Sequence, residues 1–145
     1  MAEIERLNGT LQENIITLLA HNDEYGKIIA ARVKPQLFEG EYRTIAERAL
    51  SYWARHGEAP KHHMADLMDD ILSDTRNRRS KSVERILRSM LELAPNINAV
   101  YVTGELTRFN RGQRFKDAVL KSAEQLNSSS EVALEDVEPQ LTPSG

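Results

Sequence analysis

The spacing of hydrophobic residues predicts α-helices wherever it is regular. The clearest stripe recurs at intervals of three and four residues, as Tyr42, Ile45, Ala46, Ala49, Leu50 and Trp53. This is the spacing of a helix with one buried face. No window shows the sustained alternation of a half-buried strand. The predicted fold class is therefore all-α, with a small multi-helix bundle.

Capping and stop signals divide the bundle into helices. Thr10, with Glu13 three residues later, predicts a capping box at the start of the first helix. Asn22 predicts the cap of the second helix, in which Gly26 is expected to cost up to about 1 kcal/mol relative to Ala. Gly57 predicts a left-handed stop after the striped helix.

The second half of the chain is more basic. Residues 73–82 are expected to form a polar loop, and the next helix is expected to end before Pro95. Residues 110–112 predict either the turn of a hairpin or a glycine tolerated within one long helix, and periodicity does not decide between them. The predicted organisation is a flexible N-terminus (1–9), a globular helical bundle (10–95), a helical hairpin (96–127) and a disordered acidic linker or tail (128–145).

Charge is partitioned sharply along these 145 residues, although the formal net charge is only −3. Residues 1–74 carry 8 basic and 13 acidic side chains, residues 75–126 carry 11 and 5, and residues 127–145 carry none and 4. The near-neutral total argues against a chain that is basic throughout, as many nucleic-acid binders are. The partition suggests instead that one surface pairs with another by charge.

Motifs for catalysis are sparse. The only Gly-Lys pair is Gly26-Lys27, so this chain lacks a Walker A phosphate loop, and it has no cysteine for a thiolate site. His62 and Asp66 share a helical face next to His63, which makes a divalent-metal enzyme one hypothesis. Two ligands on one face are more typical of a solvated helix start. We therefore expect no catalytic residues, no metal and no cofactor in this chain.

Two clusters of side chains suggest binding surfaces. Exposed apolar positions on the predicted hairpin indicate an oligomer or partner interface formed by Val100, Tyr101, Leu106, Phe109, Phe115 and Val119. Basic positions are candidates for phosphate contacts, namely Arg76, Arg78, Arg79, Arg111 and Arg114. An independent nucleic-acid-binding domain that uses Arg76–Arg88 and Arg108–Lys116 is the alternative function.

Several strings resemble the N-terminal domain of DnaB-type replicative DNA helicases. They are Lys34-Pro35-Gln36-Leu37-Phe38, Tyr42-Arg43-Thr44-Ile45, Arg55-His56-Gly57-Glu58-Ala59-Pro60, Asn98-Ala99-Val100-Tyr101-Val102 and Arg114-Phe115-Lys116-Asp117-Ala118-Val119-Leu120. The resemblance covers about residues 10–127, and it implies a bundle over residues 11–94 that is followed by a helical hairpin over residues 98–126. It implies a collar domain that forms part of a ring hexamer and docks primase or a helicase loader.

The resemblance also implies that ATP and Mg²⁺ belong to a motor domain outside this chain, with weak or indirect DNA contact by the collar. The related helicase-binding domain of a primase is the other family-level alternative. The acidic N-terminus lacks the features of a signal peptide, and no apolar run approaches the ~20 residues of a membrane span. A cytoplasmic protein without membrane contact is expected.

Overall fold

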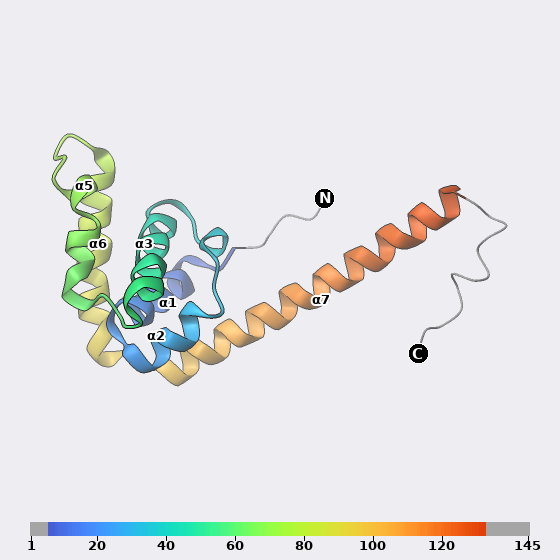
Figure 1. The fold of residues 1–145 in the computed structure, drawn as a ribbon, viewed down its shortest axis with the longest axis horizontal. Helices are drawn as coiled ribbons and strands as arrows, with labels where there is room; N and C mark the ends of the chain where they lie inside the picture. Colours follow the sequence, from blue (N-terminus) through green and yellow to red (C-terminus); the bar gives the residue numbers. More distant parts are fainter. Residues whose placement is uncertain (1–5, 133–145) are drawn as a thin grey trace. The chain divides into compact units, whose positions relative to one another are not determined.

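The computed structural model describes residues 6–132, and side chains through Asn127. This part of the chain is all-α and contains no strand, which confirms the predicted all-α, multi-helix class. It divides into two compact units after Phe109, and each is considered by itself. The α-helices, labelled in Figure 1 where there is room, are α1 (Gly9–His21), α2 (Asp23–Ala30), α3 (Gly40–His56), α4 (Met64–Leu67), α5 (Asp69–Leu72), α6 (Arg78–Leu93) and α7 (Ala99–Val132). Three short 3₁₀ turns are η1 (Pro35–Leu37), η2 (Lys61–His63) and η3 (Ala94–Asn96).

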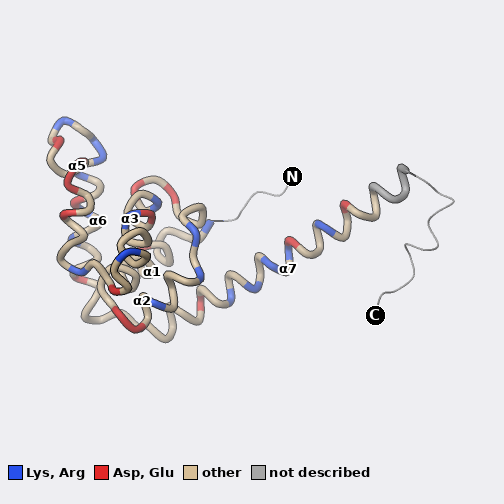
Figure 2. Tube along the Cα trace, viewed as in Figure 1, with Lys and Arg blue, Asp and Glu red and all other residues tan. Residues whose placement is uncertain are grey.

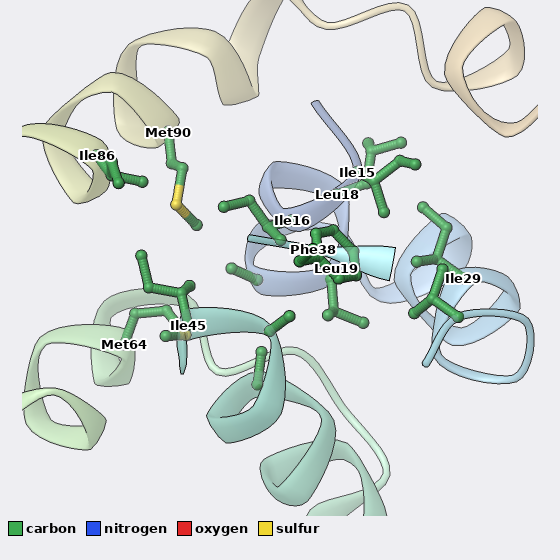
Figure 3. Packing of buried hydrophobic residues seen from close by; sticks show 14 of the residues in the cluster. Ile15, Ile16, Leu18, Leu19, Ile29, Phe38, Ile45, Met64, Ile86 and Met90 are labelled. Atoms are coloured by element: carbon green, nitrogen blue, oxygen red, sulfur yellow. The ribbon is translucent and has the colours of Figure 1, made fainter. Parts of the chain in front are cut away.

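Helix α1 forms the centre of the bundle. Its residues from Ile15 to Ala20 are all buried, and the helix packs against α2, α3 and α6. Figure 3 shows side chains from these helices converging around it, together with Phe38, which follows η1. A helix that is apolar on nearly every side belongs in a core rather than on a surface. The most buried helix of the unit is thus its first one.

A close contact between α2 and α3 depends on Gly26. A Cβ atom at this position would lie 2.8 Å from both the Leu18 carbonyl oxygen and Cζ2 of the Trp53 indole. The indole Nε1–H donates to the Leu19 carbonyl oxygen at 2.7 Å. Gly26 therefore allows close approach of three helices, which outweighs the loss of helix propensity expected from the sequence.

The chain is ordered earlier than the sequence predicted. Leu7 is buried, and its N–H donates to the Leu37 carbonyl oxygen at 3.2 Å, so the predicted flexible N-terminus is wrong at this position. The predicted cap at Thr10 is also wrong. Asn8 caps α1, because its Oδ1 accepts from the Leu11 N–H at 2.8 Å. Residues 1–5 lie outside the described part of the chain.

The other capping predictions are confirmed. The Asn22 side chain accepts from the Tyr25 N–H at 2.8 Å, and Gly57 ends α3 with φ of +67°. Next to this stop, Asp23 Oδ2 accepts from the Lys61 ammonium at 2.7 Å and Oδ1 accepts from the Ala59 N–H at 2.9 Å. These two hydrogen bonds hold the pKa of Asp23 below its usual range.

The second half departs more from prediction. Helix α6 begins at Arg78, where Asn77 caps it, so the predicted loop 73–82 is five residues too long at its end. The hairpin is wrong as well, since α7 runs without a turn through residues 110–112 and continues to Val132. The predicted disordered tail therefore starts too early, and its residues 133–145 lie outside the described part of the chain. No helix among the described residues is long and apolar enough to cross a membrane.

Replacing Gly26→Ala is expected to lower the free energy of unfolding by about 1–3 kcal/mol, because the new methyl group would overlap Trp53 and a backbone carbonyl. The measurement is urea denaturation followed by circular dichroism. Gly104→Ala is the matched control, because nothing lies within 4 Å of a Cβ atom at that helical position. It should stabilise by about 0.5–1 kcal/mol. Equal effects of the two variants would contradict this account.

Candidate interaction surface on α7

The first part of α7 belongs to the bundle. Asn98 caps the helix by accepting from the Tyr101 N–H at 3.0 Å. Val102 and Leu106 are buried in the same hydrophobic cluster as α1, and Phe109 packs partly against it. The spacing of these three residues is that of a helix with one face on a core.

The rest of α7 has a different environment. From residue 114 to residue 127 every side chain is exposed. Phe115 is 71% exposed, Val119 51% and Leu126 59%. These three residues, which we call the α7 stripe, follow each other at intervals of four and seven, so they share one helix face. Leu120 is 41% exposed but lies on another face.

An exposed apolar stripe on a helix is unusual for two physical reasons. Helices in proteins gain most of their stability from tertiary packing of an apolar face. Soluble monomers also rarely leave large apolar side chains aligned in water. The stripe is therefore the strongest candidate for an interaction site among the described residues.

Figure 2 shows that basic residues recur along α7. Arg111, Arg114 and Lys121, which we call the basic column, are all exposed and follow each other at intervals of three and seven. At 100° per residue they fall within a sector of about 80° and span roughly 15 Å of helix. Among the described side chains no ion pair involves them, whereas Arg108 contacts Glu105 at 3.5 Å.

Among the basic residues near the start of α6, Arg79 is hydrogen-bonded to α3, unlike the basic column of α7. Arg79 Nε donates to Glu41 Oε1 at 3.1 Å, and its Nη2 donates to the Thr44 hydroxyl at 2.8 Å. Arg76 and Arg78 are exposed. The structure therefore assigns Arg79 a bond to α3, which reduces the charge that this cluster offers to a phosphate.

The histidine cluster is a surface feature of the bundle. His63 Nδ1 lies 3.2 Å from Asp66 Oδ2, and the His62 and His63 rings are 4.0 Å apart. Tyr52 is close to the ring of His56, at 4.4 Å. Within the described residues, no group of three or more His, Asp or Glu side chains is arranged to hold a metal ion.

The six predicted interface residues separate into two groups. Phe115, Val119, Val100 and Tyr101 are exposed, as an interface requires. Leu106 is fully buried and Phe109 partly so, because both pack onto the bundle, and Leu106 is therefore not available to a partner. The prediction from sequence did not include Leu126 among the interface residues or Lys121 among the phosphate contacts. If one continuous helix is assumed, the spacing of positions 115, 119 and 126, and that of 111, 114 and 121, places each set on one helix face.

No protein-family model matches the chain, and neither the curated proteins nor the solved structures contain a significant match. The surface must therefore be interpreted from its own chemistry.

Alanine substitutions in the two parts of α7 should have different effects on the free energy of unfolding. Leu106→Ala is expected to lower the free energy of unfolding by about 2–5 kcal/mol, because it leaves a cavity in the core. Phe115→Ala should change it by less than about 0.5 kcal/mol at low protein concentration. Urea denaturation of both variants at about 1 µM provides the comparison. A large loss for Phe115→Ala would show that this ring is covered within one chain.

Proposed function

We propose that this protein is an interaction and oligomerisation module whose α7 stripe pairs with the α7 stripe of a second copy. The observation that supports it is the alignment of Phe115, Val119 and Leu126 on one exposed helix face. Covering such side chains is worth roughly 1.5–3 kcal/mol each. A second copy offers a stripe of equal length and the same chemistry, as a two-fold interface requires.

The charges on α7 favour an antiparallel pair. From Arg111 to Lys116 the helix carries three cations and no acid. From Asp117 to Asn127 it carries two acids and one cation. A parallel pair would set the two basic halves against each other, whereas an antiparallel pair places each basic half beside the more acidic half of the second copy. In that arrangement Phe115 of one copy faces Leu126 of the other.

The resemblance to the collar domain of DnaB-type helicases supports a more specific setting. In it, this chain contributes to the collar of a ring hexamer in the primosome and docks primase or a helicase loader. ATP hydrolysis with Mg²⁺ then takes place in a motor domain outside this chain. The helicase-binding domain of a primase is the alternative. A Gly-x-x-x-x-Gly-Lys-Ser/Thr motif downstream in the same reading frame favours the helicase, and its absence favours the primase.

Self-association should be weak and concentration-dependent. Three side chains per copy must offset the entropy of association, so we expect a Kd on the order of 10 µM. Light scattering with size-exclusion chromatography, from about 1 to about 500 µM, measures it. Phe115→Gln and Val119→Gln should each shift the chain towards monomer, because a polar amide replaces an apolar contact.

Leu120→Gln is the matched control for these variants. It makes a similar change on the same exposed segment but outside the α7 stripe, so it should leave self-association unchanged. A wild-type chain that remains monomeric over the whole concentration range would contradict the proposal. A loss of association in Leu120→Gln equal to that in Val119→Gln would move the interface to another face.

The distance between two spin labels can distinguish an antiparallel from a parallel helix pair. The chain has no cysteine, so Gln113→Cys provides a single site for a spin label. In an antiparallel pair the two labels should lie about 22 Å apart along the helix axis, whereas in a parallel pair they should lie about 10 Å apart. Leu120→Cys, near the centre of the pair, should give a short distance in either case. Short distances at both sites would establish the parallel pair.

A further inference from the structure

The basic column lies on α7 beside the stripe, not within it. Positions 111, 114 and 121 fall on one flank of the stripe, while Lys116 falls on the other flank. Pairing through Phe115, Val119 and Leu126 therefore leaves the basic column facing solvent. This charge has no counterpart among the ion pairs of the described side chains.

The orientation of the pair decides where the two basic columns lie. In a parallel helix pair, equivalent flanks of the two helices face opposite sides of the seam. In an antiparallel pair they face the same side, because reversing one helix exchanges its flanks. The antiparallel pair therefore displays six cations on one face, three from each copy.

We propose that this face binds the phosphodiester backbone of nucleic acid. The inference rests on the antiparallel pair of the proposed function. Two columns, each of about 15 Å, suit an extended polyanion better than a single phosphate. The columns contain no aromatic side chain for base stacking and no paired amides for base readout, so binding should be independent of sequence. Arg114 and Arg111 were candidate phosphate contacts from the sequence, and Lys121 is added by the helix geometry.

Two basic residues of α6 are already engaged by neighbouring side chains. Arg79 is held by Glu41 and Thr44, and Arg88 is held by Glu84 at 2.7 Å. Arg111, Arg114 and Lys121 carry no such bond to the described side chains. Contact with a phosphate at the basic column therefore requires no ion pair to be broken.

The test is fluorescence anisotropy of the full chain with labelled oligonucleotides of about 25 nucleotides, one duplex and one single-stranded oligothymidine. Binding should weaken as salt rises. For the duplex, the slope of log K against log salt should be about −5, because six cations displace counterions at about 0.9 each. The two probes distinguish duplex from single-stranded backbone as the source of the phosphates. Absence of binding to both probes at about 50 mM salt would overturn the proposal.

The decisive variant is Arg111→Gln, Arg114→Gln and Lys121→Gln combined. It should weaken binding at least about tenfold at low salt while leaving self-association, measured by light scattering on the same samples, in place. Arg76→Gln, Arg78→Gln and Lys81→Gln combined is the control, since it removes the same charge from exposed positions of α6 and the loop before it. It should retain binding. The opposite result would place the site on the bundle and overturn the proposal.

The dimer and the nucleic-acid face can fail separately. In Val119→Gln, the monomer should bind with a slope of about −3, because only one basic column remains. A wild-type monomer that binds with this slope overturns the two-column face together with the proposed function. A wild-type dimer that shows no binding overturns only the nucleic-acid proposal.

Discussion

The bundle depends on one hydrogen bond made at a crossing of three helices. The Trp53 indole reaches over Gly26 and donates to the Leu19 carbonyl oxygen. A buried indole N–H without an acceptor costs about 1–3 kcal/mol, so this contact fixes the position of the ring as well as filling space. Because α2 and α3 are held against α1 in this way, the hydrophobic cluster closes around α1. The residues that complete this cluster include Val102 and Leu106 at the start of α7.

Helix α7 passes from one environment to another without a break in its backbone. Up to Phe109 its apolar residues complete the core, and from residue 114 its described side chains face water. The part of α7 beyond the core needs another source of stability, because helices in proteins are stabilised mainly by packing. The two glycines of α7, Gly104 and Gly112, also disfavour the helical state. An apolar stripe on that segment supplies the source once a partner covers it. The pairing proposed as the function of α7 would therefore also supply the packing that its exposed part lacks.

The sequence predicted what local periodicity controls. The stripe from Tyr42 to Trp53, the Asn22 cap and the Gly57 stop follow from patterns within a few residues, and the structure confirms them. Burial of Leu7 and Leu106 could not be predicted in this way, because both depend on contacts with distant segments. The hairpin failed for a different reason. Asn110 and Gly112 favour a turn only weakly, and a helix tolerates both when no tertiary contact requires the chain to reverse.

Net charge is a poor guide to the surfaces of this chain. Its value of −3 combines an acidic first half with a basic second half. Many charges of the bundle are consumed locally, as in the Arg48–Asp70 and Lys61–Asp23 ion pairs, which lower the pKa of both carboxyl groups. Exposed ion pairs of this kind add little stability, but they remove charge from the field that a partner senses. The basic column of α7 lacks such neutralisation among the described side chains. Its three cations therefore weigh more in recognition than the total suggests, and an antiparallel pair of two copies doubles them on one face.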